Sequence, residues 1–302
     1  MSIKVAVIQA TPVFFDREKT LQKLESLVAE QAGQGVRLVV FPESFIPGYP
    51  RGFTFGATIG RRTDTGRDLY KTYWQQSMEA GGEDLARLEK IAGRYGVWLV
   101  VGITERDPVN GSLYCTSVYV SPSEGLLGKH RKIKPTGVER LVWAEGGADS
   151  LKAFMTEIGT LGGLICWENY MPLARMAMYR QGVEIYIAPT ADSRPTWTAT
   201  MQHIACEGRC YVLGCNQFFR VEDYPAAYRE GIADSTEDII CRGGSVIVSP
   251  QGEILAGPLW DQEGVLVADL DLDEVIKSKL DFDVIGHYTR DDLFQLTITT
   301  PS

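Results

Sequence analysis

The stretch Gly162-Gly163-Leu164-Ile165-Cys166-Trp167-Glu168-Asn169-Tyr170-Met171-Pro172-Leu173 decides the fold of this chain. Its apolar run ends on a cysteine, and a helix is predicted a few residues later, because Asn169 suits a helix cap and Pro172 a first helical turn. Cys166 is therefore expected on a tight strand-to-helix turn, near backbone N–H groups and the positive end of a helix dipole. Such surroundings lower the pKa of a thiol and stabilise an anion formed by its attack. A buried structural cysteine at a strand end fits the same pattern.

Size and charge limit the functions open to the chain. With 302 residues and 33.5 kDa it can hold one large α/β domain. A net charge of −9 argues against binding nucleic acid or an anionic membrane, because too few cations are available to neutralise phosphates. No apolar run reaches the roughly twenty residues of a membrane span. The first nine residues suggest a strand rather than an export signal, and six cysteines are too few for a disulfide scaffold. We therefore expect reduced thiols and a cytoplasmic protein.

Strand and helix patterns alternate along the sequence. Strands are predicted at 3–10, 36–41, 97–104, 112–120, 159–166, 183–188, 211–218, 245–249, 253–256 and 264–270, and helices at 18–31, 84–95, 173–181 and 198–209. The strands carry apolar residues on both faces, so both sides of the sheet should be covered. No linker or repeat divides the chain. We predict a single domain over 1–302, with a core over 3–275 and a C-terminal extension over 276–302.

Three separated segments carry side chains suited to covalent catalysis. Phe41-Pro42-Glu43 places a carboxylate where a buried strand runs into a predicted loop at 42–68. His130-Arg131-Lys132 places cations at the start of a second predicted loop, 130–149, and Cys166 ends its own apolar strand. Long loops on a rigid scaffold often hold an active site. Each signal alone has an ordinary explanation, since carboxylates at strand ends are usually salt-bridged and basic clusters usually lie on solvated faces.

In this order and with these flanks, the segments resemble the nitrilase branch of the carbon–nitrogen hydrolase (nitrilase) superfamily. The resemblance covers nearly the whole chain. It includes Gly48-Tyr49-Pro50-Arg51-Gly52 after Glu43, the lysine segment with Pro135-Thr136 and Val138-Glu139-Arg140, and the run from Cys166 to Leu173. Segments 203–210 and 282–288 are also similar to nitrilase sequences.

The resemblance implies an α/β fold, specifically an α-β-β-α sandwich, and a triad of Glu43 as general base, Lys132 as stabiliser of the intermediate and Cys166 as nucleophile. Glu139 matches a second, supporting glutamate of the family. The resemblance further implies a small-molecule nitrile as substrate, no metal or organic cofactor, and a homodimer or higher homo-oligomer. The run at 145–149 departs from the Gly-Asp-Gly pattern common in the family, which leaves the conformation of that loop open.

The chemistry of nitrile hydrolysis explains why these residue types are needed. A nitrile carbon is a poor electrophile, so a polarisable thiolate suits the attack. Glu43 can take the thiol proton, while Lys132 and the backbone N–H of Trp167 can stabilise negative charge on the nitrile nitrogen. Water then converts the thioimidate to a thioester with loss of ammonia, and a second water releases the acid. Tyr49, Trp167 and Thr190 are candidate pocket residues by position, and packing alone explains each of them equally well.

Four other interpretations compete with a nitrilase. The spacing of His203, Cys206 and Cys210, with Cys215 beyond, could suggest a zinc site, but the paired spacings of structural zinc sites are missing and packed thiols explain the pattern. A papain-like Cys–His pair lacks a histidine with a local cue for a base. An amidase or carbamoylase of the same superfamily shares the triad but differs around the cysteine and the lysine. A non-enzymatic assembly protein would be favoured by a replaced triad position, and all three positions are intact.

Overall fold

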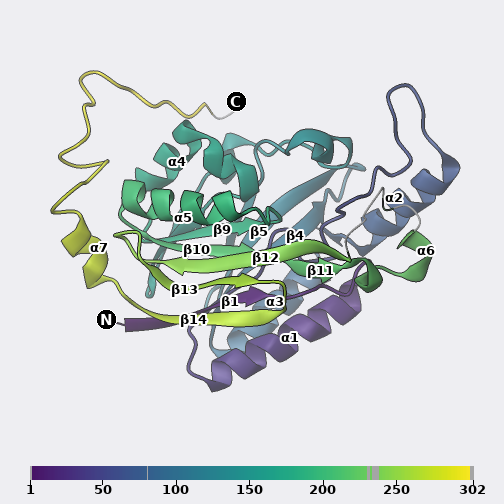
Figure 1. The fold of residues 1–302 in the computed structure, drawn as a ribbon, viewed down its shortest axis with the longest axis horizontal. Helices are drawn as coiled ribbons and strands as arrows, with labels where there is room; N and C mark the ends of the chain where they lie inside the picture. The colour runs from purple at the N-terminus through teal and green to yellow at the C-terminus, as the bar shows by residue number, and fades with distance from the viewer. Residues whose placement is uncertain (1, 80, 230–231, 233–237, 300–302) are drawn as a thin grey trace.

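The computed structural model describes residues 2–79, 81–229, 232 and 238–299. Over these residues the chain forms two seven-stranded β-sheets that face each other between two pairs of helices (Figure 1). This arrangement confirms the α-β-β-α sandwich that the resemblance implies. Among the described residues, no helix is both long and apolar enough to cross a membrane.

The first sheet has the strand order β14-β1-β2-β4-β5-β6, with β3 paired to β4. Its strands are β1 (Ser2–Gln9), β2 (Leu38–Val40), β3 (Met78–Glu79), β4 (Trp98–Arg106), β5 (Leu113–Ser121), β6 (Gly125–Arg131) and β14 (Gly264–Asp271). Strands β1, β2 and β4 run parallel, as crossover connections through α1 (Arg17–Gly33) and α3 (Glu83–Tyr95) require. Both helices bury apolar side chains on the outer face of this sheet, among them Leu21, Leu24, Leu88 and Ile91.

The second sheet has the order β11-β12-β10-β9-β8-β7, with β13 paired to β12. Its strands are β7 (Phe154–Thr156), β8 (Gly159–Gly163), β9 (Ile185–Thr190), β10 (Tyr211–Asn216), β11 (Phe218–Arg220), β12 (Ile239–Val248) and β13 (Ile254–Trp260). Helices α4 (Pro172–Tyr179) and α5 (Pro195–Gly208) cover its outer face with side chains that include Met178, Met201 and Ile204. The remaining helices are α2 (Asp64–Gln76), α6 (Ala226–Arg229) and α7 (Asp273–Ser278).

Apolar side chains from the two sheets meet in a shared core. The first sheet contributes Val5, Val7, Val40 and Val100, and the second contributes Ile185, Ile187, Leu213 and Ile247. Because neighbouring strand residues point to opposite faces, each central strand packs one face on the other sheet and one face on helices. This confirms the prediction that both sides of the sheets are covered, and it holds the strand ends of one sheet against those of the other.

Several predicted boundaries differ from the structure. The predicted loop 130–149 begins inside β6, because His130 and Arg131 pair with Ser117 and Thr116 of β5. The strand predicted to reach Cys166 ends at Gly163, and α2 begins at Asp64 within the predicted loop 42–68. Neither β6 nor α2 was predicted, and the short strands β3, β7 and β11 and the short helices α6 and α7 were also missed. Elements of this length do not show enough periodicity to be recognised from the sequence.

The segment after α7 runs back toward α4 without forming a helix or strand over residues 279–299 (Figure 1). Its Asp291 forms an ion pair with Arg180 at the end of α4. The C-terminal segment and two residues of α4, Leu173 and Met176, line a surface groove of ≈ 540 Å³. This C-terminal part of the chain therefore packs on the outer face of the second sheet's helices.

Candidate active site

Glu43, Lys132 and Cys166 follow the ends of three strands, β2 and β6 in the first sheet and β8 in the second. Two glycines let these strand ends approach their neighbours. A Cβ at Gly102 of β4 would lie 2.0 Å from the carbonyl oxygen of Pro42, next to Glu43. A Cβ at Gly163 would lie 1.9 Å from the carbonyl oxygen of Ile187 in β9. Any larger residue at either position would therefore displace the segment that carries a predicted catalytic side chain.

Cys166 occupies a strained turn. Its φ is +52°, in the left-handed region that non-glycine residues seldom adopt, and a 3-10 turn runs from Cys166 to Tyr170. The prediction that Asn169 caps the following helix is wrong. Its side-chain amide instead donates to the carbonyl oxygens of Leu164 and Cys166, at 2.9 and 2.8 Å, and so stabilises the turn itself. Pro172 does occupy the first turn of α4, as predicted.

One cation lies between two carboxylates beside this turn. Lys132 Nζ donates to Glu43 Oε1 at 2.7 Å and to Glu139 Oε2 at 2.8 Å, and all three side chains are almost fully buried. Glu139 also accepts from the hydroxyl of Tyr49 at 2.6 Å and from the backbone N–H of Thr136 at 2.6 Å. Glu43 Oε2, by contrast, is buried and has no hydrogen-bond partner among the described residues. One oxygen of Glu43 is thus available for a proton.

Burial dominates the ionisation of this cluster. It raises the pKa of Glu43 above its usual value, in spite of the opposing charge of Lys132. Burial alone would lower the pKa of Lys132, but Glu43 and the neighbouring groups hold it well above the usual value, so Lys132 is protonated. Burial and the nearby Glu43 raise the pKa of the Cys166 thiol, which contradicts the expectation of a lowered pKa. The loss of hydration on burial is the largest cause of this rise, and it favours the protonated thiol.

Cys166 lies in a cavity of ≈ 280 Å³. The walls of this cavity are Tyr49, Arg51, Thr136, Glu139, Cys166, Trp167, Ala191, Asp192 and Arg194. A second cavity of ≈ 250 Å³ shares Tyr49, Arg51 and Glu139 with it and is otherwise lined mainly by apolar residues of 50–55 and 138–143. Because three residues belong to both cavities, the two spaces adjoin.

The predicted pocket residues play different parts in this geometry. Tyr49 and Trp167 line the cavity, and Trp167 Nε1 donates to Asp192 at 2.8 Å. Arg194 pairs with the same aspartate and lies 4.8 Å over the Trp167 ring. Thr190 is fully buried and donates through its hydroxyl to Cys166 Sγ at 3.1 Å, so its contact is with the sulfur rather than with the open cavity.

Two residues of this region carried no signal in the sequence. Cys115 of β5 donates from its thiol to Glu43 Oε1 at 3.4 Å. Glu168 accepts the backbone N–H of Ile133 at 2.6 Å and that of Ile165 at 2.8 Å, and it contacts His130 Nε2 at 2.9 Å. Glu168 therefore connects the residues that flank Lys132 with the residue that precedes Cys166. Both contacts join distant parts of the chain, which no local spacing reveals.

The surroundings of His130 favour its charged form. Its Nδ1 faces the carbonyl oxygen of Ser150 at 3.1 Å and its Nε2 faces the Glu168 carboxylate, so both ring nitrogens meet acceptors and both must donate. Burial opposes protonation, but Glu168 outweighs it and the pKa of His130 lies above the usual value. His130 is thus occupied by Glu168 and is not positioned as a base by any free ring nitrogen.

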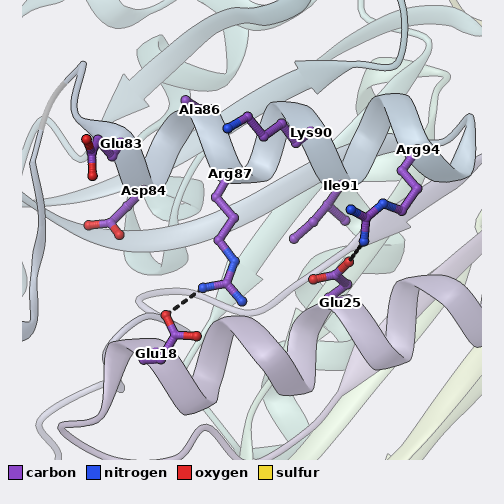
Figure 2. Close-up of a pocket in the computed structure, with 9 residues that line it drawn as sticks. All are labelled: Glu18, Glu25, Glu83, Asp84, Ala86, Arg87, Lys90, Ile91 and Arg94. Carbon is purple, nitrogen blue, oxygen red and sulfur yellow. Dashed lines mark hydrogen bonds and ion pairs between the residues drawn. The ribbon is translucent and has the colours of Figure 1, made fainter.

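The other sequence motifs do not form a second reactive centre. Cys210 and Cys215 are buried in apolar clusters, and His203 is largely exposed beside Glu207. Across the described ranges, no group of three or more His, Cys, Asp and Glu side chains is arranged to hold a metal ion. A surface hollow of ≈ 610 Å³ between α1 and α3 is lined mainly by charged residues, and two ion pairs cross it (Figure 2). These pairs are Arg87 with Glu18 and Arg94 with Glu25.

The chain is similar to known proteins along most of its length. The profile of the carbon–nitrogen hydrolase family matches residues 4–279. The chain is 48% identical over 301 residues to the bifunctional nitrilase/nitrile hydratase NIT4B of Nicotiana tabacum, covering 98% of this chain and 86% of that protein. It is 45% identical to the aliphatic nitrilase of Sinorhizobium fredii, covering 98% and 95%. The crystal structure of Nit3 of Saccharomyces cerevisiae, a member of branch 10 of the nitrilase superfamily, has the same fold, with a TM-score of 0.75, 22% identity and coverage of 95% and 96%.

Proposed function

The chain belongs to the nitrilase branch of the carbon–nitrogen hydrolase family, and we propose that it hydrolyses an organic nitrile to the carboxylic acid and ammonia through a covalent intermediate on Cys166. The observation that supports this mechanism best is that the nucleophile and a member of the charged cluster line the same cavity. Cys166 and Glu139 both line it, and Glu139 is joined through Lys132 to Glu43. The sulfur nucleophile therefore lies on the cavity wall, and the cation and the carboxylate with a free oxygen lie behind that wall, joined to it through Glu139.

The first half of the reaction forms the thioimidate. Glu43 Oε2 takes the thiol proton of Cys166 while the sulfur attacks the nitrile carbon, and one electron pair of the triple bond moves to nitrogen. Lys132 and the backbone N–H of Trp167 stabilise the negative charge on that nitrogen. Glu43 then returns the proton to the nitrogen. The raised pKa of Glu43 suits this shuttle, because it brings the carboxyl closer to the operating pH.

The second half releases ammonia and then the acid. Glu43 takes a proton from a water that attacks the thioimidate carbon, which gives a tetrahedral intermediate. Transfer of a proton to the amine nitrogen lets ammonia leave and forms an acyl-thioester. A second water, activated in the same way, breaks the carbon–sulfur bond and frees the acid and the thiol. Glu139 supports both halves by holding Lys132 in place, and Tyr49 and Trp167 form walls for the organic part of the nitrile.

Departure of the thiol instead of ammonia from the tetrahedral intermediate would yield an amide. The relative from Nicotiana tabacum is named a bifunctional nitrilase/nitrile hydratase, so both products should be measured for this chain. Thr190 is proposed to hold the sulfur through its hydroxyl hydrogen bond rather than to contact the organic part of the substrate.

We also propose a single cytoplasmic domain that assembles into a homodimer or a larger homo-oligomer. The turn before α4 and the start of that helix expose Tyr170, Met171 and Leu173, and contiguous exposed apolar side chains often mark an interaction site. Size-exclusion chromatography with light scattering tests the assembly, and a single cooperative unfolding transition tests the domain. A monomer at all concentrations would contradict the assembly.

The mechanism is tested by replacing Cys166 and a matched cysteine outside the site. Cys166→Ala should reduce release of ammonia and acid from a panel of aliphatic, arylacetonitrile and aromatic nitriles to the uncatalysed level, with an unchanged circular dichroism spectrum. Cys206→Ala on α5 should retain activity. Intact-mass measurement after rapid quenching should detect an acyl or imidate adduct in the unmodified protein and not in Cys166→Ala. Full nitrile hydrolysis by Cys166→Ala would refute the mechanism, and hydrolysis of amides but not nitriles would point to an amidase.

A further inference from the structure

We propose that the thiol of Cys115 is a positioning residue for Glu43: it holds Oε1 together with Lys132, so that Oε2 alone is presented to the reacting proton. This inference rests on the proposed role of Glu43 as the base. It assigns a function to a second cysteine of the site, one that does not line the cavity.

The contacts of Cys115 reach two members of the charged cluster. Its side chain is 1% exposed, and its Sγ donates to Glu43 Oε1 at 3.4 Å. Its backbone carbonyl oxygen accepts the N–H of Lys132 at 2.8 Å. Cys115 is absent from the walls of both adjoining cavities, and its thiol is engaged by Glu43, whereas the Cys166 sulfur lies on the cavity wall. One residue of β5 thus fixes the backbone of the lysine and one oxygen of the carboxylate.

The two oxygens of Glu43 consequently differ. Oε1 accepts from an ammonium and a thiol, whereas Oε2 is buried without a partner in the described chain. A carboxylate that lost the thiol would keep only one strong contact, to Lys132, and could turn about its terminal bond. Because terminal sp² torsions are broad, a second contact is needed to keep a chosen oxygen facing the reaction.

The ionisable groups that interact with Glu43 include Tyr49, on the loop that follows it, and four others from the surrounding elements. Lys132 lies at the end of β6, Glu139 lies in the following turn, Cys115 lies on β5, and Cys166 lies after β8. Burial and the charge of Glu43 raise the pKa of the Cys115 thiol well above its usual value. Cys115 therefore keeps its proton and remains a donor throughout the pH range of the reaction.

A donor to the ionised carboxylate favours its charged form, which opposes the effect of burial on Glu43. Removal of the thiol should raise the pKa of Glu43. Since kcat/KM requires the ionised base, its acid limb should then move to higher pH. For a weak donor we expect a shift of about 0.5 to 1 pH unit and a kcat about 3- to 10-fold lower.

Three substitutions separate the hydrogen bond from packing. Cys115→Ser keeps a donor, Cys115→Ala removes it and leaves a small cavity, and Cys115→Val removes it but fills the space. For Cys115→Ser we expect the acid limb of the kcat/KM profile to stay close to that of the unmodified protein. For Cys115→Ala and Cys115→Val we expect it to move to higher pH. Cys210→Ala, which removes a buried thiol from the core under α5, should leave the limb in place. A wild-type limb in Cys115→Val, or equal shifts in Ser and Ala, would overturn the proposal.

The S–H stretching band gives a second readout that does not depend on turnover. The infrared difference spectrum between the unmodified protein and Cys115→Ser isolates this thiol. Its band should lie at the lower frequency of a hydrogen-bonded donor, and Glu43→Gln should move it upward. A band at the frequency of a free thiol would overturn the proposal even if Cys115→Ala failed to fold. These outcomes are independent of the Cys166→Ala test, so the two proposals can fail separately.

Discussion

Two buried glutamates near the cavity, Glu168 and Glu43, differ in how their carboxylate oxygens are hydrogen-bonded. Glu168 has both oxygens satisfied, since Oε1 accepts the N–H of Ile133 and Oε2 accepts the N–H of Ile165 and contacts His130. Glu43 has two donors on Oε1 and none on Oε2. An unsatisfied buried oxygen costs stability. The comparison indicates that Glu168 is built for rigidity, whereas Glu43 retains one oxygen for proton transfer.

Between the two glutamates, the larger expected effect on turnover comes from Glu43→Gln. The amide cannot take a proton, so we expect kcat to fall about 10²- to 10⁴-fold. Lys132 keeps its contact with Glu139, which limits the loss of stability. Steady-state assays of ammonia release, paired with denaturant unfolding, measure the two effects. Substantial activity in this variant would break the comparison, because Glu43 would then be structural like Glu168.

The largest expected effect on stability comes from Glu168→Gln. It leaves the buried His130 without its counter-charge and turns an amide N–H₂ toward backbone donors, at an expected cost of about 3–5 kcal/mol. The pKa of His130 is raised in the folded state, so the stability of this pair is fully present below about pH 6.5 and is lost as pH rises through the folded pKa.

Denaturant unfolding of the unmodified protein and Glu168→Gln should therefore differ most near about pH 6 and less at alkaline pH. A gap that is constant with pH would mean that His130 is uncharged in the folded protein. A difference in unfolding free energy below about 1 kcal/mol would mean that Glu168 contributes no more than a solvent-exposed ion pair.

A smaller effect on turnover is expected from Tyr49→Phe. This substitution tests Glu139, whose hydrogen bonding lies between that of Glu43 and that of Glu168. This carboxylate is satisfied, but one of its donors is the Tyr49 hydroxyl on the cavity wall. Loss of that hydrogen bond should loosen Lys132 and lower kcat about tenfold with little change in unfolding free energy. Separate measurement of kcat and KM distinguishes the outcomes, because a change confined to KM would make Tyr49 a wall residue only.

The sequence predicted much of this architecture because its signals are local. Alternating apolar runs with glycine stops identified most central strands and the four long helices on the outer faces, and the turn at Cys166 was visible in its own dodecapeptide. The meeting of Glu43 with Lys132 came from resemblance to a family, since 89 residues separate them. Spacing alone offered no reason to bring them together.

The parts that escaped prediction depend on tertiary environment. The Cys115–Glu43 contact spans 72 residues, and nothing in the β5 sequence marks that thiol. The raised pKa of Cys166 arises from burial, which a turn motif does not reveal. Asn169 was assigned to a helix cap from its residue type, whereas its amide reaches back to the turn carbonyls. Long-range desolvation and side-chain reach are therefore the missing information.

The reacting groups are divided between the two layers of the sandwich. Glu43, Cys115 and Lys132 lie on strands of one sheet or directly after them, while Cys166 and Thr190 lie on or after strands of the other. Neither layer alone assembles a complete reaction centre, so the spacing between layers is itself a catalytic parameter. We therefore expect a change of side-chain volume at Val7 or Ile187, which are buried in the shared core, to alter the rate through the packing of the two sheets.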